Sequence, residues 1–263
     1  MTLEPTVAQT NIIDPTDLPS KRRVLVTGAA GNIGSYFAAN SSDKYDLRLM
    51  VRERDWGVDR IRSFGEVVHS DLGDLERLKE VCAGMDTIVH FAANPDPDAS
   101  WEKLLGPNII GAHNMFAAAV AAKVRRVIYA SSVHAVAGYP EDVSVKSSDP
   151  VNPLDLYGVT KCFGEAMARY TATQHGVSAI VIRIGAYKSV ERGRLDQGAH
   201  LVNSFVSKND LIQLMHRSIE IEDLPFAILH AVSDNPFKRL DLSDTQDLTG
   251  YEPLDSVMRD ASE

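Results

Sequence analysis

A short apolar run followed by three regularly spaced glycines constrains the fold of this chain more than any other feature. Residues 24–27 (Val-Leu-Val-Thr) precede Gly28, Gly31 and Gly34, and a helical pattern begins within this spacing. Gly28 suits a tight turn at positive φ, Gly31 lets the backbone approach a pyrophosphate, and Gly34 lets the helix pack close to the strand. The glycines alone would indicate only a structural turn. Their context predicts a strand, a turn and a helix whose N-terminus holds dinucleotide phosphates, beginning at Asn32 and Ile33.

Strand-like apolar runs alternate with helical patterns along the rest of the chain. The expected strands cover residues 24–27, 45–51, 66–70, 87–91, 126–130, 179–183 and 226–232. The expected helices cover residues 75–82, 109–122, 157–175 and 209–219, and Asn209 or Asp210 is the expected N-cap of the last. This alternation indicates βαβ units, so we predict an α/β fold with a Rossmann-type doubly wound parallel sheet.

The pattern also predicts the domain organisation. Residues 1–20 contain three prolines and no clear period, which is typical of a flexible N-terminal tail. Residues 21–263 are expected to form a single Rossmann-type domain. Periodicity is weaker near its C-terminus, and the part from about residue 184 is expected to be a small substrate-binding portion over the carboxyl edge of the sheet.

Composition argues against several classes of function. The 263 residues carry a formal net charge of −9, and such a surface repels nucleic-acid phosphates. Cys82 and Cys162 form no CxxC pair and lie near no histidine at ligand spacing, which predicts no disulfide, no metal site and a reducing, cytoplasmic setting. Neither a run of about 18 apolar residues nor a signal-peptide pattern occurs, so we expect no membrane partner.

The end of the second expected strand bears on the choice of cofactor. Sites for NAD often place an acidic residue there to bind the ribose 2′-hydroxyl, but this chain has Val51, followed by Arg52 and Arg54. A guanidinium pairs well with a 2′-phosphate, which favours NADP with Arg52 as its ligand. Glu53 keeps NAD possible, and both arginines are alternatively plain surface residues.

A tyrosine, a lysine and a serine form a candidate catalytic set. Tyr157 and Lys161 stand four residues apart in an expected helix and so share one face, although such a pair is also common on surfaces. An ammonium beside a phenol lowers the phenol's pKa, and the tyrosinate then accepts a proton from a substrate hydroxyl while hydride leaves the same carbon for an oxidised nicotinamide. The fifth strand ends in Ser131-Ser132 at the edge where such sheets bind ligands, and we favour Ser132 as the partner of the reacting oxygen.

Together these motifs resemble one family. Residues 22 to about 253 are similar to the extended short-chain dehydrogenases/reductases, which include the nucleotide-sugar epimerases. The signatures are residues 27–34, Asp71-Leu72, His90-Phe91-Ala92-Ala93, Asn108, Ser131-Ser132, Tyr157-Gly158-x-x-Lys161 and Gly250-Tyr251-x-Pro253.

The resemblance implies roles for several of these residues. Asp71 and Leu72 would flank the adenine. The residues expected to line or contact the rest of the cofactor are Phe91, Ala92, Ala93, Tyr157 and Lys161. Asn108 would support the helix that carries Lys161 or take part in a proton relay, and His90 would pack rather than bind a metal. The resemblance also implies a homodimer in which helices 109–122 and 157–175 pair across a two-fold axis.

Within the family, the chain is similar to the uronate dehydrogenases and their archaeal sugar dehydrogenase relatives. The segments that carry this similarity are residues 130–134, 156–165 and 183–185. That branch oxidises the anomeric carbon of a cyclic aldose or uronate to a lactone, and it grips the uronate carboxylate with an arginine. His200 aligns near that arginine, with Arg192 and Arg194 close by.

Two positions depart from the branch, since Val133 and Ala186 stand where it has polar residues. A neutral or differently charged sugar therefore fits this chain at least as well as a uronate. His134 and Asn94 are expected substrate contacts, with a purely structural hydrogen-bonding role as the alternative for each.

Three functions remain open from the sequence. The first is a sugar 1-dehydrogenase, the second a nucleotide-sugar epimerase or dehydratase, and the third a dinucleotide-binding sensor without catalysis. The short segment after Lys161 leaves little room to grip a nucleotide diphosphate, and the intact Ser, Tyr and Lys set argues against a sensor. We therefore expect a sugar 1-dehydrogenase, and a reductase of a small carbonyl compound would use the same chemistry in reverse.

Overall fold

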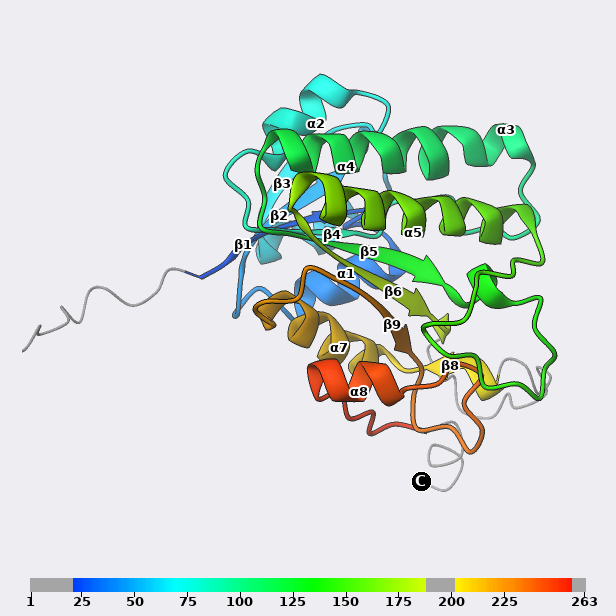
Figure 1. Ribbon diagram of the computed structural model, residues 1–263. Coiled ribbons are helices and arrows are strands. Elements are labelled where there is room, and N and C mark those ends of the chain that lie inside the picture. The colour runs from blue at the N-terminus through cyan, green and yellow to red at the C-terminus, as the bar shows by residue number, and fades with distance from the viewer. Residues whose placement is uncertain (1–20, 188–201, 257–263) are drawn as a thin grey trace, which may run out of the picture.

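The computed structural model describes residues 21–187 and 202–256, which form a sheet covered by helices on both faces (Figure 1). The seven parallel strands follow the order β3-β2-β1-β4-β5-β6-β9. They are β1 (Arg23–Thr27), β2 (Asp46–Val51), β3 (Glu66–His69), β4 (Thr87–His90), β5 (Arg126–Ser132), β6 (Ser178–Ile184) and β9 (Phe226–Ala231). A two-stranded parallel sheet of β7 (Ala186–Tyr187) and β8 (Phe205–Val206) follows β6.

Helices of two groups cover the two faces of the sheet. On one face lie α2 (Leu75–Cys82), α4 (Gly111–Ala121) and α5 (Leu156–His175), and on the other α1 (Asn32–Ala39), α7 (Lys208–Glu220) and α8 (Ser243–Thr249). Short helical segments are η1 (Val58–Arg60), η2 (Arg62–Phe64), α3 (Trp101–Leu104), η3 (Leu105–Ile110) and η4 (Val133–Val136).

Strand β1 shows why a continuous apolar run is needed at the centre of this sheet. Val24 and Val26 pack into the apolar cluster that contains helices α1 and α7, whereas Leu25 packs into the cluster that contains α2 and α4. All three side chains are fully buried. A strand covered on both faces cannot alternate apolar with polar residues, which explains the pattern in the sequence.

The expected fold is confirmed, and the differences lie at the ends of elements. Each of the seven expected strands is present with its ends within two residues of the prediction. The expected cap of α7 was wrong: Ser207 is the N-cap, and its hydroxyl accepts a hydrogen bond from the backbone N–H of Asp210 at 3.0 Å. A serine is as good a cap as Asn or Asp, and the helix starts one residue earlier than predicted.

The expected helix 109–122 is the second half of a longer helical stretch, Trp101–Ala121. Its middle section, η3, is a π-helix that places Asn108 in the interior. Length and composition alone would let this stretch cross a membrane, but its apolar residues Met115, Phe116 and Ala119 pack against the sheet. The expected flexible tail at residues 1–20 lies outside the described residues.

Candidate active site

The glycine turn after β1 has the geometry that the sequence predicts. Gly28 has φ +66°, and a Cβ there would lie 2.9 Å from the backbone nitrogen of Ala92. A Cβ on Gly34 would lie 2.3 Å from the carbonyl oxygen of Gly28, so the helix rests directly on the turn. Helix α1 starts at Asn32 after Gly31, and no side chain caps its N-terminus. Its first N–H groups, including that of Ile33, are therefore available to a phosphate.

A buried histidine holds the neighbouring loop in place. The Thr27 hydroxyl accepts a hydrogen bond from the N–H of Ala92 at 3.1 Å and forms a second hydrogen bond with Nδ1 of His90 at 2.8 Å. Burial, helped by the positive charge of Lys161, lowers the pKa of His90 to about 3, so the ring is neutral. This agrees with the packing role expected for His90. Within residues 21–187 and 202–256, no group of three His, Cys, Asp or Glu side chains is placed to hold a metal ion.

Residues after β2 and β3 form the far end of the same cavity. Arg52, Asp71 and Leu72 line it as predicted, together with two residues that the sequence did not single out, Asp55 and Trp56. The carboxylate of Asp55 accepts hydrogen bonds from the backbone N–H of Arg52 at 2.8 Å and from its Nε at 3.0 Å. Asp55 thus fixes the direction of an arginine side chain that stays 71% exposed. The sequence holds one indication of this contact: Asp55 stands three residues after Arg52, a spacing at which an Asp side chain commonly binds the backbone of a turn.

Two serines at the end of β5 have different partners. The Ser131 hydroxyl donates to Glu165 at 2.6 Å, and Glu165 in turn forms a buried bidentate ion pair with Arg183. The Ser132 hydroxyl instead accepts from the N–H of His134 at 3.2 Å and hydrogen-bonds with Tyr157. The geometry therefore supports the choice of Ser132 over Ser131.

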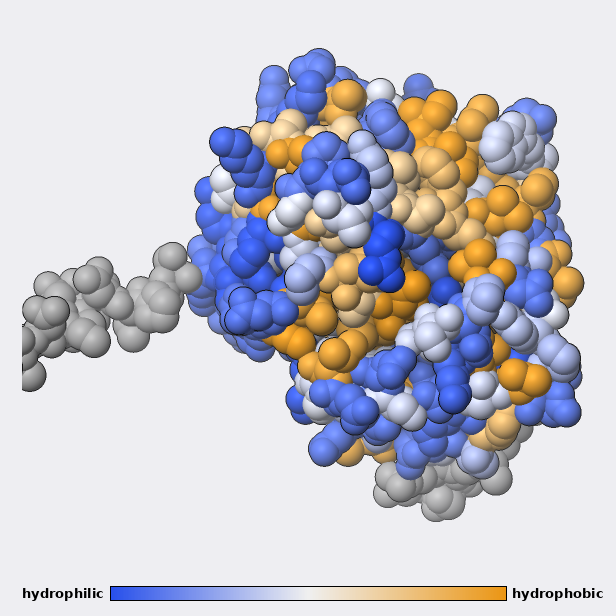
Figure 2. Space-filling view, viewed as in Figure 1, coloured by the Kyte–Doolittle hydropathy of each residue, from blue (hydrophilic) through white to orange (hydrophobic). Residues whose placement is uncertain are grey.

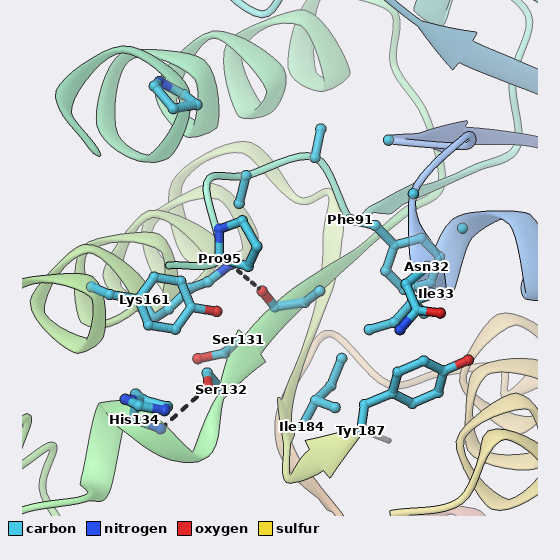
Figure 3. A pocket seen from close by; sticks show the side chains of 18 of the residues that line it. Asn32, Ile33, Phe91, Pro95, Ser131, Ser132, His134, Lys161, Ile184 and Tyr187 are labelled. Carbon is cyan, nitrogen blue, oxygen red and sulfur yellow. Dashed lines mark hydrogen bonds between the residues drawn. The ribbon is translucent and has the colours of Figure 1, made fainter. Parts of the chain in front are cut away.

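Helix α5 brings Tyr157 and Lys161 to the cavity wall. Figure 3 shows Lys161 near Ser131 and Ser132. The Lys161 ammonium donates to the carbonyl oxygen of Ala130 at 2.8 Å and lies 5.5 Å from the centre of the Tyr157 ring. Both side chains are buried. The three candidate catalytic groups thus meet at one point, as the sequence predicts from two elements far apart along the chain.

The expected pKa shift of Tyr157 differs from what the structure gives. Lys161 was expected to lower this pKa, but burial raises the pKa of Tyr157 to about 12, against a smaller lowering by the Ser132 hydrogen bond. The reason is that Tyr157 loses its hydration, while Lys161 directs its ammonium to a backbone oxygen. Burial also lowers the pKa of Lys161 to about 8.

Asn108 supports the helix that carries Lys161, as the resemblance implies. Asn94, expected as a substrate contact, instead makes local hydrogen bonds. The Asn108 side chain accepts from the N–H of Asn94 at 2.7 Å and donates to its carbonyl oxygen and to the Thr160 hydroxyl, both at 3.0 Å. Asn108 thus braces the helix position next to Lys161. Asn94 does not line the cavity, because its own side chain turns to accept from the N–H of Asp96 at 3.2 Å. This arrangement favours the alternative, structural role of Asn94, and its contact with a substrate stays a prediction.

His134 faces the cavity in a well-defined arrangement. Its Nδ1 lies 2.6 Å from one carboxylate oxygen of Asp155, and its ring packs edge-on against Tyr157 at 5.4 Å. The other oxygen of Asp155 accepts from the N–H of Gly158 at 2.7 Å and caps α5. Because a carboxylate only accepts, Nδ1 carries a proton, and in the neutral ring Nε2 is then the acceptor. Asp155 was not predicted, although an Asp before an apolar helix start signals a cap.

The remaining wall comes from the C-terminal part of the chain. Ile184, Tyr187, Ser204 and Arg239 line the cavity there, and Figure 3 shows Ile184 and Tyr187 across from Ser132 and His134. The Arg239 guanidinium donates to three backbone carbonyls of residues 139–143, which ties this loop to the C-terminal part. His200, Arg192 and Arg194, the residues near the expected carboxylate grip, lie outside the described residues.

The residues that line these walls surround one continuous cavity of about 1230 Å³. Figure 2 shows it as a hollow near the centre of the visible face, with apolar side chains inside. Phe91, Ala92 and Ala93 line its middle as predicted, between the glycine turn and the Ser132 end. The volume exceeds that of a typical drug-sized pocket and suits a dinucleotide together with a small second molecule.

The chain is similar to a protein family and to several known proteins. The model of the NAD dependent epimerase/dehydratase family matches residues 24–213. The L-arabinose 1-dehydrogenase (NAD(P)(+)) of Haloferax volcanii is 33% identical over 254 residues, which cover 89% of this chain and 97% of that protein. The NAD-dependent glucose-6-phosphate dehydrogenase of the same organism is 30% identical, over 89% of this chain and 93% of that protein. The crystal structure of uronate dehydrogenase from Agrobacterium tumefaciens has a TM-score of 0.79 at 29% identity and covers 91% of this chain and 86% of that chain.

Proposed function

This chain belongs to the NAD-dependent epimerase/dehydratase family, and from its site we propose that it oxidises the anomeric carbon of an aldose or aldose derivative to a lactone, using NAD(P). The observation that carries this proposal is the meeting of Ser132, Tyr157 and Lys161 at one end of a cavity that also contains the glycine turn. The two similar proteins of Haloferax volcanii named above are both dehydrogenases of sugars or sugar phosphates.

The residues divide the reaction between them. Ser132 hydrogen-bonds the anomeric hydroxyl of the sugar and directs it to the phenol oxygen of Tyr157. As phenolate, Tyr157 takes the hydroxyl proton while the C–H bond of the same carbon breaks and a C=O bond forms, which gives the lactone. A nicotinamide bound there supplies the hydride acceptor. Lys161, held by the Ala130 carbonyl oxygen 5.5 Å from the centre of the Tyr157 ring, adds a positive charge near the phenolate below its own pKa of about 8.

A panel of sugars tests the proposal directly. Purified protein is incubated with NADP, or with NAD, and with aldoses, aldose phosphates or uronates, while the absorbance of the reduced cofactor is followed. We expect a rise with one class of sugar and formation of the corresponding lactone. Dinucleotide binding without turnover of any free sugar would instead support an epimerase acting on a nucleotide sugar, or a sensor.

For the cofactor we propose NADP, with the Arg52 guanidinium as ligand of the 2′-phosphate. Its orientation by Asp55 supports this role, because Nη1 is not used in that pair and is left to donate to a phosphate. Replacing Arg52 by Ala is expected to raise the Kd for NADP by about 10- to 100-fold, the worth of a hydrogen bond to a charged group, and to change the Kd for NAD by roughly two-fold or less.

Titration calorimetry with both dinucleotides measures these constants. Arg54→Ala is the matched control, because Arg54 is exposed and does not line the cavity. It is expected to leave both constants unchanged. Equal losses for NADP and NAD in the Arg52 variant would refute a contact with the 2′-phosphate.

For the substrate we propose that Nε2 of His134 accepts a hydrogen bond from a sugar hydroxyl, with Asp155 fixing the ring. Replacing His134 by Ala is expected to raise the sugar KM by about 10-fold, with a smaller change in kcat and none in the KM for dinucleotide. Asp155→Ser keeps a side chain that caps α5 but cannot hold the histidine, so it is expected to raise the sugar KM without loss of stability. An unchanged sugar KM in the His134 variant would show that this histidine is only structural.

We also propose a cytoplasmic homodimer, formed through the helices α4 and α5. Apolar side chains that are partly exposed on this side of the molecule include Ile110, Leu156 and Val159, and Figure 2 shows apolar surface over α3 to α5.

Light scattering after gel filtration is expected to give about twice the 28.8 kDa of one chain. Val159→Glu is expected to give monomers, whereas Leu248→Glu on α8 is not, and a wild-type monomer would exclude the dimer.

A further inference from the structure

One aromatic side chain at the mouth of the cavity lacks a covering within the described part of the chain. Trp56 is 92% exposed, the highest value among the large apolar residues that the structure describes as exposed. It lines the end of the cavity where β2 and β3 stop, on the same wall as Arg52 and Asp55. An indole is a large apolar surface, and leaving it in water has a cost that a flat apolar partner would remove.

The turn that carries Trp56 is built to hold it in place. Asp55 donates its backbone N–H to the carbonyl oxygen of Arg52 at 3.1 Å, while its carboxylate accepts from the N–H of Arg52 at 2.8 Å. On the other side of the indole, Gly57 has φ +82°, and its carbonyl oxygen accepts from the N–H of Arg60 at 3.1 Å. Ile61, fully buried in the core, anchors the segment that follows. The indole is thus displayed by a closed turn.

The position of the turn identifies the occupant. The glycine turn after β1 fixes where a pyrophosphate lies, and β2 and β3 are the next two strands outward, paired in parallel. Arg52 follows the end of β2, Asp71 and Leu72 follow the end of the neighbouring strand β3, and all three line the cavity. Moving outward from the pyrophosphate, the ribose therefore reaches Arg52, and the next group, the adenine, reaches the space between Leu72 and Trp56.

We propose that the indole of Trp56 stacks on the adenine of the bound dinucleotide and covers the adenosine end of the cavity. This inference rests on the dinucleotide binding proposed above. Stacking of a base on an aromatic ring is tolerant of sequence and of the 2′-phosphate, so Trp56 contributes affinity for NAD and NADP alike. Arg52 then distinguishes NADP from NAD through the 2′-phosphate, and Trp56 binds the adenine that both cofactors contain.

Intrinsic fluorescence tests the contact, because the chain has two tryptophans, Trp56 and Trp101. Trp101 does not line the cavity, so Trp101→Phe leaves Trp56 as the only indole without touching the site. In this variant, AMP and ADP-ribose are expected to quench or shift the emission, whereas nicotinamide mononucleotide, which lacks adenine, is not. A response to nicotinamide mononucleotide equal to that for AMP would overturn the stacking.

Affinities measured by calorimetry provide the second readout. Trp56→Leu is expected to raise the Kd for ADP-ribose, NAD and NADP by roughly 5- to 100-fold, while Trp56→Phe, which keeps a ring, retains most of the affinity. The melting temperature is expected to stay unchanged because the side chain is exposed. Unchanged affinities in Trp56→Leu would overturn this inference and leave the proposed function intact. Absence of dinucleotide binding in the unaltered protein as well would overturn both.

Discussion

Replacing Tyr157 by Phe is expected to lower kcat by about 10²- to 10⁴-fold, the usual worth of a positioned acid–base group, while dinucleotide still binds. The substitution removes only the phenol oxygen, and the ring keeps its packing against His134. The proton of the anomeric hydroxyl then loses the acceptor that lies beside Ser132, because the Ser132 hydroxyl is a far weaker base and Lys161 is a donor. Assays of sugar oxidation and dinucleotide titrations on the same preparation measure the two effects separately.

The rate of sugar oxidation is expected to depend on pH through the ionisation of Tyr157. Oxidation needs Tyr157 as phenolate, and burial raises its pKa to about 12. Below the pKa the phenolate fraction increases about tenfold for each pH unit, so kcat/KM for oxidation is expected to increase as pH increases through the neutral range. Oxidised nicotinamide is cationic when bound and lowers this pKa, so the plateau is expected below pH 12.

The residual activity of the Phe variant should lack this dependence. Tyr157→Phe is expected to show a flat profile over the range in which the wild-type rate increases. Ser131→Ala serves as a matched control, because the Ser131 hydroxyl is bound to Glu165 instead of Tyr157. A Phe variant that retains most of the wild-type turnover would refute the assignment of Tyr157 as the proton acceptor.

The features of the fold and the site that the sequence predicts correctly are those set by local backbone geometry or by the spacing of residues along the chain. The Gly28 turn, the buried run of β1 and the shared face of Tyr157 and Lys161 follow from local rules that hold whatever surrounds them. The parallel order of the strands then carries the end of β5 to the start of α5. For these reasons the fold and the meeting of the three candidate catalytic residues were predictable.

Three other features depend on tertiary contacts with residues far away in the sequence, whose positions the sequence alone does not give. Both serines line the cavity, and Glu165 decides which hydroxyl is engaged elsewhere, because it binds that of Ser131 next to its buried ion pair with Arg183. The Asn94 side chain accepts from the N–H of Asp96, and its backbone is held by Asn108. Helix α8 was missed because its polar sequence shows no apolar period, and it is docked through Thr245, whose hydroxyl accepts from a backbone N–H of β9.

Gly34 is the second position where a substitution is expected to have a large effect. A Cβ there would lie 2.3 Å from the carbonyl oxygen of Gly28 and 2.9 Å from the Cα of Ala29, and both are backbone atoms that cannot rotate away. The turn must shift by several tenths of an ångström even for Ala, and by more for Val. Because this turn presents the N–H groups at the start of α1, its displacement alters the place where a pyrophosphate binds.

Gly34→Ala is therefore expected to lose at least about 1–3 kcal/mol of folding free energy through overpacking, and to bind NAD(P) more weakly by roughly 10-fold or more. Gly34→Val is expected to bind no measurable dinucleotide. Thermal unfolding followed by circular dichroism gives the stability loss, and calorimetry gives the affinity. Addition of dinucleotide is expected to raise the melting temperature of the wild type far more than that of either variant, because only binding to the folded state stabilises it.

A control is needed to separate weaker binding from lower stability. Gly176 follows α5 at φ +68°, a Cβ there would have no atom within 4 Å, and the residue is far from the glycine turn in sequence and not on the cavity wall. Gly176→Ala is strained by its backbone conformation alone and is expected to lose roughly 1–2 kcal/mol while its dinucleotide affinity stays that of the wild type. If Gly34→Ala lost stability to a similar degree but bound dinucleotide normally, the turn would be a structural packing site, and the cavity beside it would need another ligand.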